Sequence, residues 1–95
     1  MSQTGKQAIQ PASDQFVQSL ARGLAVIRAF DAQNSSLTLS DVAMRTGLAR
    51  AVARRFLLTL ETLGYVRSNG RQYELTGLVL DLGYSYDMNL LLIAR

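Results

Sequence analysis

Apolar residues recur with helical spacing along three stretches of the chain. The first stretch predicts a helix over residues 19–32, with Ser19 placed to act as its N-cap. Four apolar side chains share one face of this helix, Leu20, Leu24, Ile27 and Phe30. The polar run at residues 34–36 that follows is interpreted as a loop.

A second, shorter helix is bounded by clear start and stop residues. Thr38 is followed three residues later by Asp41, which resembles a capping box with Asp in place of Glu or Gln. Gly47 ends the helix, because glycine adopts the positive φ of a helix C-terminus without a Cβ clash. Val42 and Ala43 are expected to face inward.

The third helix is predicted over residues 49–63, with Gly64 as its stop. Steps of about 100° per residue separate an apolar arc from a polar arc. The apolar arc holds Val52, Ala53, Phe56, Leu60 and Leu63. The opposite arc holds Arg50, Arg54, Glu61 and one apolar misfit, Leu58, and is flanked by Ala51, Arg55 and Thr62. This helix therefore has separate core-facing and cationic faces.

After the third helix the pattern becomes strand-like. Residues 65–66 and 73–75 flank the pair Asn69-Gly70, which suits the two positive-φ positions of a type I′ turn. We expect these two segments to pair as a hairpin. Two arginines flank its tip, Arg67 and Arg71.

The two ends of the chain differ in character. Residues 1–15 are polar, contain the sole proline and show no period, so they are interpreted as a disordered leader. Residues 77–95 have a helical pattern that Gly83 interrupts and that is apolar on every side. Apolar surface of this kind usually marks a partner. The pattern runs to Arg95 without a C-cap, so we expect the tail to continue toward a further domain.

Charge is distributed unevenly. The 95 residues are 48% hydrophobic and 18% charged, which is typical of one small globular domain. Between Arg45 and Arg71, however, six arginines accompany a single acid, Glu61. Such a concentration of one sign indicates a surface that meets a polyanion, although a solvated face can also be basic. The arginine fork suits phosphate oxygens and guanine edges.

Several function classes find no support. The chain has no cysteine and no histidine, which removes disulfides, thiolate metal sites and the commonest general base. No carboxylate pair shares a face with a nucleophile, so we expect neither an enzyme nor a cofactor. No run of 18 apolar residues and no secretory signal is present, so the expected location is the cytoplasm, with no membrane partner.

The order of the elements predicts a fold. Helix, short helix, glycine turn, longer helix and hairpin indicate a fold that is mainly α with a small β-hairpin, the winged helix-turn-helix. Its three-helix core and wing would occupy residues 16–76, and a linker helix residues 77–95. In this fold the third helix, about 49–63, presents its outer face to the major groove. The wing, residues 67–71, reaches the DNA backbone or minor groove.

Three segments resemble one family over about residues 16–86. VQSLARGLAVIRAF, TLSDVAMRTGLARAVARRFLLTLETLGYV and NGRQYELT are similar to the N-terminal domain of the IclR family of bacterial transcriptional regulators. The resemblance implies a homodimer on a palindromic operator, held together through the first helix and the linker helix. It also implies a small-molecule effector that binds a C-terminal domain absent from this chain.

The resemblance also implies roles for individual residues. The base-reading positions of the family fall on Arg50, Val52 and Arg55. Its phosphate-contacting positions fall on Arg22, Thr38 and Gly47. Val52 departs from the family, in which a hydroxyl residue is common, and either contacts a thymine methyl group or only packs. Ala49 replaces the usual Pro or Ser, which weakens the N-cap of the third helix.

The remaining arginines are interpreted from their positions alone. Arg54, on the cationic arc, is assigned to phosphate. Arg67 and Arg71 are either wing contacts to DNA or cross-strand surface charges. Arg45 is expected to stabilise the C-terminus of the second helix through the helix dipole.

The sequence therefore predicts a sequence-specific DNA-binding domain of an IclR-type regulator. The alternative is a winged helix whose basic face binds an acidic protein partner. Salt-dependent binding with a preference among duplex sequences distinguishes the first reading from the second.

Overall fold

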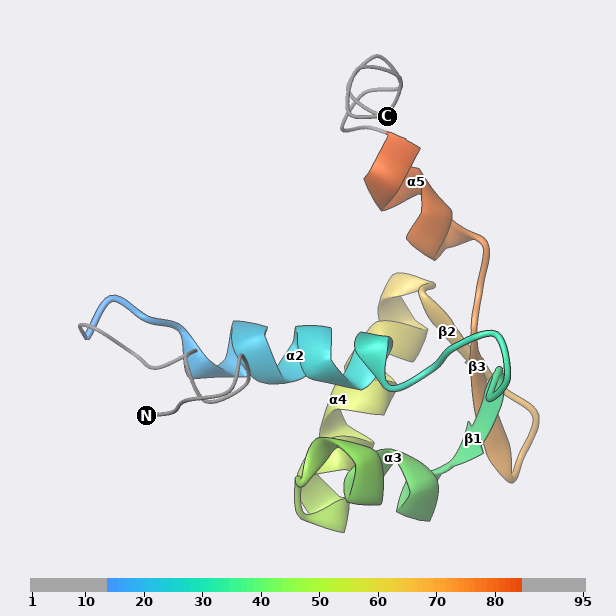
Figure 1. The fold of residues 1–95 in the computed structure, drawn as a ribbon, viewed down its shortest axis with the longest axis horizontal. Helices are drawn as coiled ribbons and strands as arrows, with labels where there is room; N and C mark the ends of the chain where they lie inside the picture. Colours follow the sequence, from blue (N-terminus) through green and yellow to red (C-terminus); the bar gives the residue numbers. More distant parts are fainter. Residues whose placement is uncertain (1–13, 85–95) are drawn as a thin grey trace.

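The computed structural model describes residues 14–84. The predicted leader therefore lies almost wholly outside the described residues, as does the second half of the predicted linker helix. Figure 1 traces the elements, which follow in the order α2 (Gln18–Arg28), β1 (Ser36–Thr38), α3 (Leu39–Thr46), α4 (Arg50–Leu63), β2 (Val66–Ser68), β3 (Gln72–Leu75) and α5 (Leu78–Tyr84). The predicted class, a mainly α winged helix-turn-helix, is confirmed.

Helix α2 begins earlier and ends earlier than predicted. Its N-cap is Val17, which has an extended backbone and no side-chain cap, so the prediction of Ser19 as N-cap is wrong. The helix stops at Arg28 because a tight turn follows it. In that turn the Asp31 carboxylate accepts the backbone N–H of Asn34 at 2.7 Å, and such local acceptors compete with helix continuation.

The apolar face predicted for α2 is correct only in its C-terminal half. Leu20 and Leu24 are 63% and 51% exposed, whereas Val26 is fully buried and Phe30 is 7% exposed. Figure 1 shows that the N-terminal half of α2 extends beyond α3 and α4, so within residues 14–84 the side chains of Leu20 and Leu24 lie away from the core. Helical spacing identified the helix but not which part of it reaches the core.

The start and stop of α3 are confirmed. The Thr38 hydroxyl accepts the Asp41 backbone N–H at 3.1 Å, and the Asp41 carboxylate accepts the Thr38 backbone N–H at 3.1 Å, which completes a capping box. Gly47 adopts a φ of +76° at the C-cap. Val42 and Ala43 are buried as expected.

Helix α4 matches the predicted range, with Ala49 as N-cap and a left-handed Gly64 as C-cap. Its buried side chains are Ala53, Leu57 and Leu60, at i, i+4 and i+7. Two assignments were wrong. Leu57, left out of the predicted apolar arc, is fully buried, and Leu63, placed in that arc, is 58% exposed on the last turn. The face of α4 that points toward the core is therefore rotated toward Leu57 relative to the predicted apolar arc.

A three-stranded antiparallel sheet closes the fold, with strand order β1-β3-β2. Strand β1 includes Ser36, so the predicted loop over residues 34–36 is wrong at its last residue. Leu37 of β1 lies opposite Tyr73 of β3, and its side chain is buried. A three-residue strand whose partner is some thirty-six positions away leaves little local signal in the sequence.

The hairpin forms, but its turn is shifted by one residue from the prediction. Ser68 lies opposite Tyr73, and the Asn69 backbone N–H donates to the Gln72 carbonyl at 3.0 Å. The central residues are therefore Gly70, with a φ of +106°, and Arg71. This glycine-first order is typical of a type II′ turn, so the prediction of Asn-Gly in a type I′ turn is wrong.

Helix α5 starts close to the end of α4. The Thr76 hydroxyl donates to the Gly64 carbonyl at 2.6 Å, and the Thr76 backbone N–H donates to the Tyr65 carbonyl at 2.9 Å. From this junction α5 runs away from the sheet and the other helices (Figure 1). Gly83 lies inside α5 and does not end it.

Candidate nucleic-acid interface

The turn between α3 and α4 is held by side-chain hydrogen bonds. The Thr46 hydroxyl donates to the Val42 carbonyl at 2.8 Å and accepts the Leu48 backbone N–H at 3.3 Å. Leu48 is partly buried against the core. These contacts fix the direction in which α4 leaves the turn.

The N-terminal half of α4 presents cations to solvent. Ala49 has the extended backbone of an N-cap but no oxygen to cap with, and the first turn contains no acid. Arg54 and Arg55 are exposed, and within residues 14–84 neither side chain has a hydrogen-bond or ion-pair partner. Their charges are therefore available to an anion.

Arg50, the first residue of α4, has one contact to another element. Its Nη1 donates to the hydroxyl of Ser40 on α3, and both residues are exposed. The hydroxyl is neutral, so Arg50 keeps its full charge. Sequence analysis did not identify Ser40, because a contact between residues ten positions apart on two helices has no periodic signature.

Val52 lies between the two faces of α4. Its side chain is partly buried, while Arg54 and Arg55 are exposed. This intermediate position is compatible with both predictions for Val52, a contact to a thymine methyl group or packing alone.

Two of the positions assigned to phosphate lie at the ends of α3. The Thr38 hydroxyl accepts the Asp41 N–H, and the Thr38 side chain also hydrogen-bonds the Asp41 carboxylate and lowers its pKa, so this hydroxyl is already engaged in the capping box. The Gly47 backbone N–H donates to the Ala43 carbonyl at 2.9 Å. Apart from its chain neighbours, no residue in the range 14–84 has an atom within 4 Å of the position that a Cβ of Gly47 would take, so the backbone there is open to close approach.

The other predicted site residues lie on separate elements. Arg22 is exposed on α2, and Arg71 is exposed in the turn of the hairpin. Arg67 on β2 is paired instead, since its Nε donates to Glu74 Oε2 across the strands at 3.0 Å. The predicted cross-strand charge pair of Arg67 is therefore present, and a contact of Arg67 with DNA stays a prediction.

Arg45 lies in the last turn of α3, where the dipole argument expected it. Its Nη1 also donates to the Ala29 carbonyl at 3.3 Å and lies 3.9 Å from the Asp31 carboxylate. Hydrogen bonds from the side chain and backbone of Asn34 are the main causes that lower the pKa of Asp31, and Arg45 adds a smaller effect. Arg45 thus connects α3 to the end of α2.

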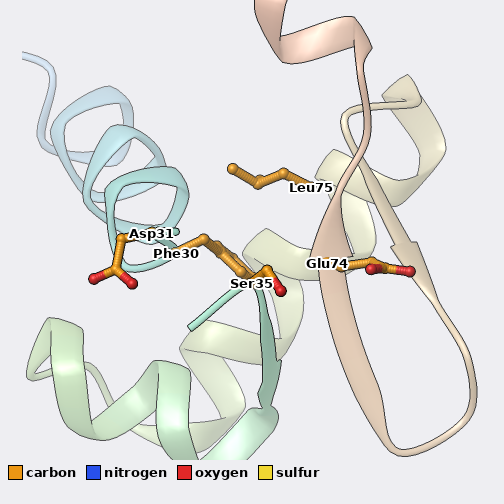
Figure 2. A pocket seen from close by; sticks show the side chains of 5 residues that line it. All are labelled: Phe30, Asp31, Ser35, Glu74 and Leu75. Atoms are coloured by element: carbon orange, nitrogen blue, oxygen red, sulfur yellow. The ribbon is translucent and has the colours of Figure 1, made fainter. Parts of the chain in front are cut away.

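A shallow hollow lies beside the sheet, lined by Phe30, Asp31, Ser35, Glu74 and Leu75. Figure 2 shows the carboxylates of Asp31 and Glu74 pointing to opposite sides, with Leu75 between α2 and β3. The lining contains two acids and no arginine, so this hollow is not suited to a polyanion.

Among residues 14–84, no three or more acidic, histidine or cysteine side chains are grouped so that they could hold a metal ion. None of the helices in this same range is long and apolar enough to cross a membrane.

Comparison with known proteins gives a consistent answer. The model of the IclR helix-turn-helix domain matches residues 19–70. The Pca regulon regulatory protein of Pseudomonas putida is 51% identical over 71 residues, which cover 75% of this chain and 24% of that protein. The chain spans about a quarter of the length of the curated relatives it matches.

Solved structures agree in fold. A crystal structure from Rhodococcus sp. RHA1 is 66% identical with a TM-score of 0.71, covering 75% of this chain and 28% of that one. An IclR family transcriptional regulator from Brucella abortus is 36% identical with a TM-score of 0.75, covering 82% of this chain and 30% of that one. The chain therefore belongs to the IclR family, whose helix-turn-helix domain binds DNA to regulate transcription.

Proposed function

We propose that this chain binds a palindromic operator as a homodimer and reads its sequence with α4 in the major groove. The observation that carries the proposal is the solvent-exposed side of the N-terminal half of α4. On that face Arg54 and Arg55 are exposed and have no partner within residues 14–84. A helix of this width fits the major groove, and unpaired arginines supply both phosphate and base contacts.

The arginines of α4 have different tasks. Arg50 and Arg55 read base edges, because the N-terminal part of a recognition helix is the part that reaches them. Arg54 holds phosphate. Val52 is partly buried and offers at most a methyl contact to thymine.

Phosphate contacts orient the domain on the duplex. Thr38, at the N-terminus of α3, would have to exchange its side-chain hydrogen bond with the Asp41 carboxylate for a phosphate oxygen, and the open backbone at Gly47 allows close approach to the DNA strand. Arg22 supplies a cation from α2. In the wing, Arg71 contacts backbone or minor groove, whereas Arg67 contributes less because Glu74 already neutralises it.

Dimerisation uses apolar surface that the single domain leaves open. Val17, Leu20 and Leu24 form an exposed stripe on α2, and Leu80 and Leu82 are exposed on α5. Surface of this kind is usually covered by a partner, and a second copy is the partner that a palindromic site requires. Residues 77–95 would act as the linker helix.

An effector, if one regulates the protein, would bind the part that relatives have and this chain does not cover. The site of action would be the bacterial nucleoid in the cytoplasm, since the ligand is duplex DNA.

The test is selection of bound duplexes from a random pool, combined with a mass measurement of the complex. The expected result is a symmetric consensus bound by two protomers, with affinity that falls as salt rises. Binding that is indifferent to duplex sequence would contradict the proposal and favour a winged helix that recognises an acidic protein.

A further inference from the structure

Ser40 and Arg50 connect the N-termini of α3 and α4. Ser40 is exposed at the second residue of α3, and its hydroxyl accepts a hydrogen bond from Nη1 of Arg50, the first residue of α4. Neither residue is needed to bury the core, since both are exposed. The contact therefore affects where the guanidinium lies more than how stable the fold is.

The backbone at Ser40 is held in place on both sides. Ser40 lies between Thr38 and Asp41, which form the capping box, and Thr38 also pairs with Gln72 in the sheet. Arg50, in contrast, has a long side chain in a helical turn without a side-chain cap. Ordering such a side chain lowers its rotamer entropy, which weakens binding. An acceptor that already holds the Arg50 side chain reduces the entropy that the side chain still loses when DNA binds.

The chemistry of the acceptor matters as much as its position. A carboxylate in place of Ser40 would neutralise Arg50, as Glu74 does for Arg67. The nearest acid in sequence, Asp41, accepts the Thr38 N–H instead. A neutral hydroxyl occupies one of the five guanidinium N–H groups and leaves the charge and the other four for DNA.

We propose that Ser40 is a positioning residue that holds the Arg50 guanidinium ready for a base edge. This inference rests on the proposed function of α4. The competing explanation is that Ser40 contacts a phosphate directly and independently of Arg50.

A double-mutant cycle on the selected operator separates these explanations. The proteins are the 95-residue chain and its variants Ser40→Ala, Arg50→Ala, the double variant and Ser40→Thr. Ser40→Ala is expected to weaken binding about 3- to 10-fold. In the Arg50→Ala background it is expected to have no further effect, because the group it positions is gone. Ser40→Thr keeps the hydroxyl and is expected to retain affinity.

Base preference gives a second readout. Ser40→Ala is expected to relax preference at the same base position as Arg50→Ala does. The matched control is Thr62→Ala, which removes an exposed hydroxyl about 18 Å further along α4 and should leave binding unchanged.

Three outcomes would overturn the inference. An equal loss from Ser40→Ala in both backgrounds would assign Ser40 to phosphate. A Ser40→Thr variant as weak as Ser40→Ala would show that the hydroxyl is not what matters. If the unmodified chain binds duplexes without sequence preference, the proposed function fails and this inference fails with it.

Discussion

Arg67 and Glu74 lie directly opposite each other on β2 and β3, with Nε and Oε2 3.0 Å apart. The pair is partly exposed, so its contribution to stability is small, about 0.2 to 1 kcal/mol. Its larger effect is on charge, because it removes one cation from the wing of a DNA-binding domain.

Replacing Glu74 by Gln is therefore expected to strengthen DNA binding. The variant releases Arg67 and removes a negative charge, so affinity should rise several-fold on every duplex sequence and should fall more steeply with salt. Titration at two salt concentrations measures both effects. Arg67→Ala is the control, and an unchanged salt dependence in Glu74→Gln would show that the wing does not meet DNA.

The arginines of α4 are expected to fall into two groups. Arg50→Ala and Arg55→Ala should each cost about 1 to 3 kcal/mol of binding free energy and relax base preference at one position. Arg54→Ala should weaken binding to all duplexes to a similar degree. Binding measured against a panel of single-base operator variants distinguishes these outcomes. A uniform loss in Arg50→Ala and Arg55→Ala would assign them to phosphate as well.

Replacing Ala49 by Ser is expected to stabilise the domain. Ala49 already has the φ of −64° and ψ of 149° of an N-cap, so a serine hydroxyl could accept an amide of the first turn without backbone change. The gain should be about 0.5 to 1 kcal/mol in urea unfolding. Ala51→Ser, two residues further along the chain, is the matched control and should give no gain. A gain from both would point to an effect unrelated to capping.

Stability is expected to fall in acid, in part through Asp41. The backbone hydrogen bond from Thr38 is the main cause that lowers the pKa of Asp41 below its ordinary value of 3.8. The stabilisation is thus complete above that value and is lost as pH falls through the lower folded-state pKa. Unfolding midpoints measured from pH 7 to pH 3 should decline less for Asp41→Asn than for the unmodified chain. Equal declines would mean that other carboxylates, such as Asp31, dominate.

The sequence was most informative where a local rule involves neighbouring residues. The Thr38–Asp41 capping box and the stops at Gly47 and Gly64 each depend on a few adjacent positions, and all three are present in the structure. The same applies to the cationic face of α4, which follows from helical spacing alone.

What sequence analysis missed depends on tertiary arrangement. The exposure of Leu20 follows from how far α2 extends beyond its neighbours, and the pairing of β1 with β3 joins distant segments. The contacts of Arg50 with Ser40 and of Arg67 with Glu74 need known registers between elements. Charge counting showed where the arginines are, but only the fold shows which of them remain unpaired.

The junction at Gly64 restricts which residue can occupy that position. The Thr76 hydroxyl donates a hydrogen bond to the Gly64 carbonyl, and a Cβ at Gly64 would lie only 3.2 Å from Leu78 Cδ2. Gly64 also has a φ of +96°, which side chains with a Cβ rarely adopt. Any other residue here would therefore strain the end of α4 and displace Leu78 at the same time, so a single glycine both ends α4 and makes room for the start of α5.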